Sequence, residues 1–334
     1  MSTPSRPLIT VLGSSGLLGS AITRELAARP VRLRLAGRRA TTVPAGAAAE
    51  IEVRTTDLTT DGAVADAVEG ADVVIHLVAH IAGASTWRVS SDDPVAERVN
   101  LGLVHDLVAA VKDQRPATPP VVLLAGSMSQ AGHSISGRID GTEQDKPITT
   151  YDRQKLDAEH AIRDATEAGL LRGASLRLAT LYTQGSDSTA LDRGVVSAMT
   201  RRAFAGEPLT MWHDGTVKRD LVCVDDVARA FVAALDRPDA VEGRPWLVGT
   251  GQATSIADLF GGIAKVVAAQ TGKDPVPVVS VKPADHSMPT DLLDFVLDPS
   301  AFQAATGWAP RVSLEQGLEN LAAAMAREAA AAGV

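Results

Sequence analysis

The stretch Leu8-Ile-Thr-Val-Leu12-Gly13-Ser-Ser-Gly16-Leu-Leu-Gly19 joins a short apolar run to three spaced glycines. We expect a strand, a tight turn and a helix here, because glycine permits both the turn and close contact between helix and strand. The N-terminus of a helix also offers N–H groups and a partial positive charge to a phosphate. An ordinary strand–turn–helix is the simpler alternative. The pattern favours a dinucleotide-binding turn with contacts from Gly13, Ser14, Ser15, Gly16, Leu17, Leu18 and Gly19.

Short apolar runs alternate with longer helical patterns from this stretch outward. The expected strands are Leu8–Leu12, Val31–Ala36, Ile51–Arg54, Val73–Val78, Val121–Ala125 and Ala174–Leu178. The expected helices of the same half are Leu17–Ala28, Gly62–Val68, Pro94–Val111 and Tyr151–Ala168. Apolar strands separated by helices predict an α/β fold, with a doubly wound parallel sheet of the Rossmann type covered on both faces.

The second half carries more frequent glycine and proline, and its alternation is looser. We place the dinucleotide-binding domain at residues 1–178 and a smaller, mainly substrate-binding lobe at residues 179–330. One or two elements between residues 220 and 250, around Val222 and Trp246, are expected to return to the main sheet. The expected helices of this half are Asp192–Ala205, Asp225–Leu235, Ile256–Gln270 and Leu314–Arg327.

The composition of the 334 residues argues against several classes of protein. Hydrophobic residues are 45% and charged residues 22%, which is ordinary for a globular protein with a sizeable core. The formal net charge of -8 argues against nucleic acid as a partner. The single cysteine, Cys223, excludes an intrachain disulfide and a cysteine-based zinc site, and we expect no bound metal. We expect a cytoplasmic protein without a membrane partner, since the sequence shows no signal-peptide pattern and no apolar run near the roughly 20 residues of a membrane span.

The end of the second expected strand bears on the choice of cofactor. NAD-selective sites place a carboxylate there, about 20 residues after the glycines, against the ribose 2′-hydroxyl. This chain has Gly37, followed by Arg38 and Arg39, whose guanidiniums suit a 2′-phosphate. A solvated basic loop is the alternative, but the pattern favours NADP(H). Asp57 is expected either to accept from the adenine amino group or to cap a helix beginning near Asp61.

Tyr151 and Lys155 begin another helical pattern. Their spacing puts the phenol and the ammonium on one helix face, where the ammonium lowers the tyrosine pKa from its usual value of about 10. Ser127 stands where the fifth strand ends, at the edge where a doubly wound sheet binds ligands, so it is placed to share a carbonyl oxygen with Tyr151. Ser129 is the competing hydroxyl, with the alternative of a bond to local backbone.

Together these motifs resemble the extended short-chain dehydrogenase/reductase family, also called the NAD-dependent epimerase/dehydratase family. The resemblance covers nearly the whole chain and implies that Ser127, Tyr151 and Lys155 are catalytic. His76-Leu-Val-Ala79 resembles a strand-four motif whose backbone lines the cofactor, although we interpret His76 itself as a satisfied core histidine. The expected further cofactor contacts are Asp57, Leu58, Leu77, Val78, Ala79 and Asn100.

The segment Trp212–Asp226 resembles one found in nucleotide-sugar-modifying members of that family. There an arginine meets the substrate diphosphate, and Arg219 is the matching residue; a guanidinium suits phosphate oxygens. The alternative is an Arg219–Asp220 turn network beside a helix cap at Asp225. A later segment, Lys282-Pro-Ala-Asp285, also resembles a family motif. The resemblance implies that Lys282 contacts a phosphate and that Asp285 contacts a ribose hydroxyl of the nucleotide. The implied substrate contacts are Ser129, Thr180, Arg219, Lys282 and Asp285.

Some positions depart from the family pattern. His213 replaces a usual glycine, Thr180 replaces an asparagine of sugar epimerases, and Lys282 replaces an arginine. Sugar 4,6-dehydratases carry an Asp-Glu pair after the strand-five hydroxyl residue. Met128-Ser129 at that point argues against dehydration.

The stretches Trp87–Pro94 and Asn100–Asp106 resemble 4-ketoreductases acting on dTDP-4-keto-6-deoxyhexoses in antibiotic sugar pathways. We therefore expect an NADPH-dependent reductase of such a nucleotide sugar. The alternatives are an NDP-sugar epimerase, a reductase of a non-sugar ketone, and a binding protein that holds NADP(H) without turnover. The helices over Pro94–Val111 and Tyr151–Ala168 match the dimer interface of the family and imply a homodimer.

Overall fold

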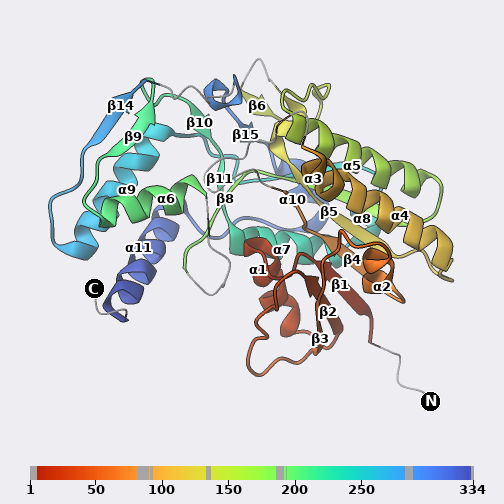
Figure 1. Ribbon diagram of the computed structural model, residues 1–334. Coiled ribbons are helices and arrows are strands. Elements are labelled where there is room, and N and C mark those ends of the chain that lie inside the picture. The colour runs from red at the N-terminus through yellow and green to blue at the C-terminus, as the bar shows by residue number, and fades with distance from the viewer. Residues whose placement is uncertain are drawn as a thin grey trace.

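A seven-stranded parallel sheet forms the centre of the computed structural model, which describes residues 6–80, 90, 93–132, 137–185, 192, 194–282 and 289–331 (Figure 1). The strand order is β12-β7-β5-β4-β1-β2-β3. The strands are β1 (Leu8–Leu12), β2 (Arg32–Gly37), β3 (Glu50–Thr55), β4 (Val73–His76), β5 (Val121–Ser127), β7 (Arg172–Leu178) and β12 (Pro245–Val248). The predicted α/β fold with a doubly wound parallel sheet is confirmed.

The helices cover both faces of this sheet, because alternate strand residues point to opposite sides. Ile9 and Val11 of β1 belong to one buried apolar cluster, and Leu12 belongs to a second. The first cluster includes side chains of α1 (Leu17–Ala27), α7 (Val224–Leu235), α8 (Pro238–Val241) and α10 (Ser300–Thr306). The second includes those of α2 (Ala63–Val68), α4 (Leu103–Gln114) and α5 (Thr150–Glu167).

The chain reverses its direction across the sheet at β1, whose neighbours are β2 on one side and β4 on the other. Ligands of doubly wound sheets bind at such a reversal, beyond the carboxyl ends of the strands. The glycine-rich turn follows β1 at this point. The fold therefore places that turn where a ligand site is expected.

A smaller lobe lies to the left of the sheet in Figure 1 and has its own apolar cluster. Its helices α6 (Val195–Phe204), α9 (Ile256–Thr271) and α11 (Leu314–Ala331) pack beside a two-stranded sheet of β9 (Leu209–Trp212) and β14 (Val278–Val281). The remaining strand pairs are β8 (Thr180–Tyr182) with β11 (Leu221–Cys223), β10 (Lys218–Arg219) with β13 (Thr254–Ser255), and β6 (Arg138–Ile139) with β15 (Val296–Leu297). A short helical turn, η3, covers Pro289–Leu292. No helix in the described part of the chain has the length and apolar character of a membrane span.

Of the one or two elements expected to return to the main sheet, one does, and the expected helix over Pro94–Val111 needs correction. The strand around Trp246 does join the main sheet, as its edge strand β12, but the strand around Val222 pairs with β8 in a separate small sheet. The helix expected over Pro94–Val111 is interrupted: α3 (Pro94–Glu97) is followed by a five-residue π-helix, η1 (Arg98–Gly102), before α4 begins. The wider turn of a π-helix marks functional sites in many proteins, and here it carries the buried Asn100.

Candidate functional site

Steric contacts, as well as flexibility, require glycine in the turn between β1 and α1. Gly13 has a φ of +88°, and its N–H donates to the Ala36 carbonyl at 2.8 Å. A Cβ on Gly19 would lie 2.3 Å from the Gly13 carbonyl oxygen. Ser14 is buried, and its hydroxyl bonds the hydroxyl of Thr41 at 2.7 Å. The turn is thus a tightly packed backbone cradle at the N-terminus of α1, which fits the phosphates of a dinucleotide.

The end of β2 lies directly beside this cradle. A Cβ on Gly37 would lie 3.4 Å from the Ser15 hydroxyl and 4.0 Å from the Gly13 Cα. Arg39 donates weakly to the Ser15 carbonyl at 3.5 Å, and the Arg38 side chain is exposed. A carboxylate at position 37 would therefore face the turn, and two arginines follow it instead. These residues fit a dinucleotide with a further phosphate on its ribose.

Asp57 does not cap the following helix, which corrects one of its two expected roles. Its carboxylate accepts from the N–H and the hydroxyl of Thr59, at 3.0 and 2.7 Å. These bonds, with a contribution from the charge of Arg38, hold the pKa of Asp57 below its usual value. Helix α2 begins after Gly62, which has no capping side chain. The adenine contact of Asp57 remains a prediction.

The segment after β4 also packs against the glycine cradle. A Cβ on Gly13 would meet the Leu77 carbonyl carbon at 3.3 Å. Asn100, turned inward by the π-helix, accepts from the His80 N–H at 2.7 Å and donates to the Gln154 side chain at 2.8 Å. It thereby ties this segment to α5. The cofactor contacts predicted here remain predictions: Leu58, Leu77, Val78, Ala79 and Asn100.

His76 is buried at the end of β4, but the interpretation as a satisfied histidine is wrong. Within the described part of the chain, neither ring nitrogen has a hydrogen-bond partner. Burial, helped by the positive charge of Lys155, lowers the pKa of His76 to about 3. A neutral imidazole therefore lies close to the predicted catalytic lysine.

Helix α5 brings the predicted catalytic residues to the carboxyl end of β5. The helix begins after Thr149, whose hydroxyl caps it. Lys155 is 3% exposed, and its ammonium donates to the carbonyl of Ala125 at 2.6 Å. Ser127 is two residues further along β5, and Tyr151 is half-buried in the first turn of α5. The fold thus gathers Ser127, Tyr151 and Lys155 where the strand meets the helix.

The pKa values of the tyrosine and the lysine move in opposite directions. Burial lowers the pKa of Lys155 to about 8, against the opposing effect of Glu159. Burial, reinforced by the charge of Asp152, raises the pKa of Tyr151 well above its usual value. The expectation that Lys155 lowers the tyrosine pKa is therefore wrong for this structure, because desolvation and the neighbouring carboxylate dominate. The phenol is held in its neutral form.

Ser127 and Ser129 form one hydrogen-bonded chain. Their hydroxyl oxygens are 2.8 Å apart, and the Ser129 hydroxyl donates to the Asp152 carboxylate at 2.5 Å. Asp152 is 2% exposed, and its second oxygen accepts from the Thr149 N–H at 3.1 Å. The alternative of a bond from the Ser129 hydroxyl to local backbone is not what the described residues show, since that hydroxyl bonds the side chains of Ser127 and Asp152; it is the Ser127 hydroxyl that accepts weakly from the Ser129 N–H at 3.4 Å. Both hydroxyls are thus coupled to the start of α5.

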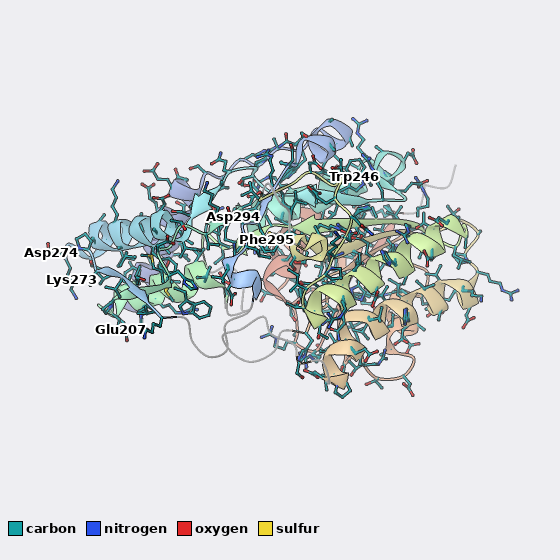
Figure 2. The ribbon with its side chains drawn as sticks, turned by 90° about the horizontal axis from the view of Figure 1, so that it is seen from above. Glu207, Trp246, Lys273, Asp274, Asp294 and Phe295 are labelled. Atoms are coloured by element: carbon teal, nitrogen blue, oxygen red, sulfur yellow. The ribbon has the colours of Figure 1, made fainter. Side chains whose placement is uncertain are left out.

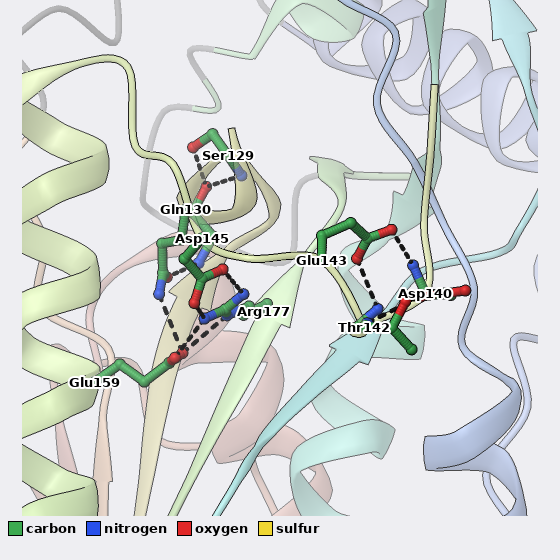
Figure 3. Close-up of polar contacts among 10 residues, drawn as sticks. Ser129, Gln130, Asp140, Thr142, Glu143, Asp145, Glu159 and Arg177 are labelled. Carbon is green, nitrogen blue, oxygen red and sulfur yellow. Dashed lines mark hydrogen bonds and ion pairs between the residues drawn. The ribbon is translucent and has the colours of Figure 1, made fainter. Parts of the chain in front are cut away.

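A buried network behind this chain fixes the turn after β5 (Figure 3). The N–H of Ser127 donates to the Gln130 side chain at 2.6 Å, and Gln130 donates to Glu159 at 3.1 Å. Arg177 of β7 binds Glu159 at 2.5 Å and binds both oxygens of Asp145, at 2.6 and 2.7 Å. The network connects β5, β7 and α5, so it holds the three predicted catalytic residues on one rigid frame.

Sequence reasoning missed Asp152, Gln130, Glu159 and Arg177. Asp152 had a local signal, because Thr149 and Asp152 have the spacing of a capping box, and the structure contains that box. The other three meet through tertiary contacts between separate elements, for which the sequence has no short-range pattern.

Arg219 lies between the two parts of the molecule. Its guanidinium donates to the carbonyls of Leu293 and Asp291 and lies 5.4 Å from the centre of the Phe295 ring. Figure 2 places Asp294 and Phe295 at this junction, far from Glu207, Lys273 and Asp274 at the outer end of the smaller lobe and from Trp246 in the larger one. Burial lowers the pKa of Arg219. The diphosphate contact of Arg219 remains a prediction.

The alternative of a turn network between Arg219 and Asp220, beside a helix cap at Asp225, is wrong, because both aspartates bind other residues. Asp220 is fully buried and accepts from the N–H and the hydroxyl of Thr250, at 2.9 and 2.6 Å. Helix α7 begins after Cys223 without a side-chain cap, so Asp225 does not cap it. Asp225 binds Arg24 of α1 at 2.8 Å instead.

Of the other predicted substrate contacts, one lies near Arg219, one is exposed elsewhere, and one lies outside the described residues. Thr180 is on β8, and its N–H donates to the Asp220 carbonyl at 3.0 Å, which puts it next to Arg219 on the neighbouring chain segment. Lys282 is exposed just after β14, and Asp285 lies outside the described residues, as does Trp87. His213 has a φ of +54°, the left-handed conformation that favours glycine, which explains the glycine of the resembled motif.

The chain is similar to proteins with known activities. Residues 9–249 match the model of the NAD dependent epimerase/dehydratase family. The dTDP-L-rhamnose 4-epimerase of Burkholderia thailandensis is 35% identical over 195 residues, 58% of this chain and 50% of that protein. The dTDP-6-deoxy-L-talose 4-dehydrogenase (NAD(P)(+)) of Kitasatospora kifunensis is 25% identical over 319 residues, 94% of each chain.

A solved structure of a UDP-glucose 4-epimerase has the same fold as this chain. The UDP-glucose 4-epimerase of Thermus thermophilus in complex with NAD is 26% identical and superposes with a TM-score of 0.77, covering 96% of this chain and 99% of that one. The glycine cradle, the parallel sheet and the match over residues 9–249 agree with one another. This chain belongs to the NAD-dependent epimerase/dehydratase family.

Proposed function

We propose that this protein reduces the 4-keto group of a nucleotide-linked 4-keto-6-deoxyhexose, with dTDP as the nucleotide and NADPH as the cofactor. The observation that carries the proposal is Gly37 beside the glycine cradle, followed by Arg38 and Arg39. Without a carboxylate at that position the site accepts a 2′-phosphate, and NADPH is the form of cofactor that cells use for net reduction. A relative whose name is that of a 4-dehydrogenase using NAD(P)(+) supports redox chemistry at carbon 4 with either cofactor.

The roles of the catalytic residues follow from their positions. The nicotinamide cofactor, when bound, supplies the hydride. Tyr151, held neutral by burial and by Asp152, carries the proton that the developing alkoxide needs. Lys155 places a buried ammonium at the end of β5, where it stabilises negative charge on the reacting oxygen and holds the nicotinamide ribose. Ser127 lies at the same strand end to hydrogen-bond that oxygen.

Substrate recognition uses the junction between the two parts of the molecule. Arg219 lies there beside Thr180 and supplies the cation for the diphosphate. Lys282 and Asp285 follow β14 and provide a phosphate contact and a ribose contact, while Ser129 contacts the sugar. Such an arrangement selects a nucleotide sugar over a free ketone, because remote phosphate contacts add binding energy that a small ketone lacks.

An NDP-sugar 4-epimerase is the second candidate, favoured by the relative of highest identity described above. The two functions separate in one assay. Purified protein is mixed with NADPH and a dTDP-4-keto-6-deoxyhexose, and loss of NADPH absorbance is followed beside chromatography of the sugar. The reductase consumes NADPH in proportion to the new hydroxyl. A 4-epimerase leaves NADPH unconsumed in this mixture and, in a second reaction without NADPH, interconverts a dTDP-6-deoxyhexose and its 4-epimer; those two results together would replace our proposal.

We also propose a homodimer formed through α4, α5 and the short helix α3. Val95 on α3 is 56% exposed, and α4 and α5 lie next to each other at the surface in Figure 1. Two such helices from each copy make a closed four-helix contact with twofold symmetry. Light scattering at several concentrations should give twice the mass of the chain. A mass equal to one chain at every concentration contradicts the proposal.

A further inference from the structure

Gln130 is a fully buried amide whose two ends meet partners of opposite kind (Figure 3). Its oxygen accepts from the Ser127 N–H at 2.6 Å, and its nitrogen donates to the Glu159 carboxylate at 3.1 Å. An ionised carboxylate only accepts and a backbone N–H only donates, so the amide fits in one orientation. Position 130 therefore requires a side chain that accepts at one end and donates at the other.

The neighbouring residues leave space for this amide and hold its partner. A Cβ on Gly126 would lie 2.9 Å from the Gln130 oxygen, a contact that real Cβ atoms do not make. Glycine directly before Ser127 thus allows the amide to reach the Ser127 N–H. On the other side, Arg177 binds Glu159 at 2.5 and 3.0 Å, which fixes the carboxylate that receives the amide nitrogen.

We propose that Gln130 is a positioning residue for Ser127: by holding the backbone N–H of Ser127, it fixes the place from which the Ser127 hydroxyl donates to the reacting oxygen. Ser127 is the N-cap of a short turn, η2 (Met128–Ala131), and the bond to Gln130 is one half of its capping box. This bond connects the serine to the buried ion network behind it. The inference rests on the proposed function, because it takes Ser127 as the residue that meets the substrate oxygen.

The substitution Gln130→Met keeps the length of the side chain and removes both bonds. The kcat for ketone reduction should fall about ten- to a hundredfold, since a small displacement of a reacting group costs that much. KM for the sugar and the affinity for NADPH should change less than about twofold, because Gln130 lies behind Ser127 and binds neither. All rates are measured well below the melting temperature of each variant. A kcat equal to that of the unmodified protein, or equal changes in kcat and KM, overturns the inference.

Thr200→Val is the control for loss of a buried polar bond. Thr200 is 1% exposed in α6 of the smaller lobe, and its hydroxyl donates to the Val196 carbonyl at 2.8 Å. This variant should lose stability and keep its kcat. A fall in kcat as large as that of Gln130→Met would show that lost stability alone lowers the rate, which overturns the inference.

The substitution Gln130→Glu keeps the shape and adds a group that titrates. A protonated carboxyl accepts from the Ser127 N–H and donates to Glu159 as the amide does, whereas an ionised one repels Glu159. The ratio of kcat in this variant to kcat in the unmodified protein should therefore fall at least about tenfold between pH 5 and pH 8. A ratio that does not change with pH overturns the inference. The other charged groups of the network are the same in both proteins, namely Glu159, Arg177, Asp145 and the nearby Lys155.

Amide hydrogen exchange in the ligand-free protein tests the position of Ser127 without any substrate. NMR should show the Ser127 N–H protected in the unmodified protein and exchanging at least about tenfold faster in Gln130→Met, because it has lost its acceptor. The Leu123 N–H of the same strand should exchange at one rate in both. Equal protection of Ser127 in both proteins, or the same acceleration at Leu123, overturns the inference. This result does not depend on turnover, so it stands apart from a failure of the proposed function, which the NADPH assay of the unmodified protein reports.

Discussion

The cofactor end and the substrate end of this molecule are built in different ways. At the cofactor end, the glycine cradle and the end of β2 meet through backbone contacts such as the bond from the Ser14 N–H to the Ala36 carbonyl, 22 positions away, at 3.3 Å. At the substrate end, Arg219 is held by carbonyls 72 and 74 positions away, in the segment before β15. The contacts of the first end join segments that leave the adjacent parallel strands β1, β2 and β4, whereas those of the second join Arg219 to the segment before β15. The cofactor end of this chain is therefore better defined by its regular elements than the substrate end is.

The largest expected effect is a loss of kcat when Tyr151, which lies between the cofactor end and the substrate end, is changed. Tyr151→Phe removes the proton donor and keeps the ring, so kcat should fall by about 10²–10⁴ while the fold and NADPH affinity survive. The chain has one other tyrosine, Tyr182, which is buried in the smaller lobe, so Tyr182→Phe is the matched control. The control should keep its rate. A Tyr151→Phe variant with more than about a third of the activity would mean another donor.

The next effect tests the substrate end. Arg219→Ala should raise KM for the nucleotide sugar strongly, since a lost buried phosphate partner costs on the order of 2–4 kcal/mol. NADPH affinity should hardly move. dTDP should raise the melting temperature of the unmodified protein by mass action, and this protection should vanish in the variant.

The neighbouring Lys218 is exposed, and Lys218→Ala should keep the protection by dTDP. If dTDP and UDP both fail to stabilise the unmodified protein, the substrate end does not bind a nucleotide. The reductase of a non-sugar ketone would then be the better account.

A smaller effect tests the cofactor end. Arg38→Ala should reduce the preference for NADPH over NADH about five- to tenfold, the size of one exposed charge-assisted contact. Gly37→Asp should shift the preference further toward NADH, and the site has room for it because a Cβ there lies in ordinary contact, 3.4 Å from Ser15. Steady-state kinetics with both cofactors checks this. Equal efficiency of NADPH and NADH in the unmodified protein contradicts the assignment.

The last effect is a change in rate with pH, which stays below about fivefold up to pH 8.5. Lys155 has a pKa of about 8, so it is charged below that value and neutral above it. If the reaction needs the ammonium, kcat should be level below pH 8 and fall by up to about tenfold per pH unit above it. The measurement is a rate profile with saturating NADPH and sugar. A profile that stays level well above pH 8 shows that the lysine charge is not required.

Much of the fold was predictable because its signals are local. The apolar runs of β1, β5 and β7, the glycines before α1, and the spacing of Tyr151 and Lys155 all act over a few residues. The pairing of β11 with β8, the π-turn at Asn100 and the network around Arg177 depend on contacts between distant segments. The raised pKa of Tyr151 has the same origin, since burial is a property of the whole fold.

Transfer of the hydride itself distinguishes the reductase from the epimerase. NADPH carrying deuterium at the transferable position of its nicotinamide ring is incubated with the protein and a dTDP-4-keto-6-deoxyhexose, and the sugar product is analysed by mass spectrometry. We predict one deuterium at carbon 4 of each product molecule. Labelled NADPH that stays unconsumed, with the ketosugar recovered unchanged, would contradict the reductase; interconversion of a dTDP-6-deoxyhexose and its 4-epimer by the same protein would then point to the epimerase.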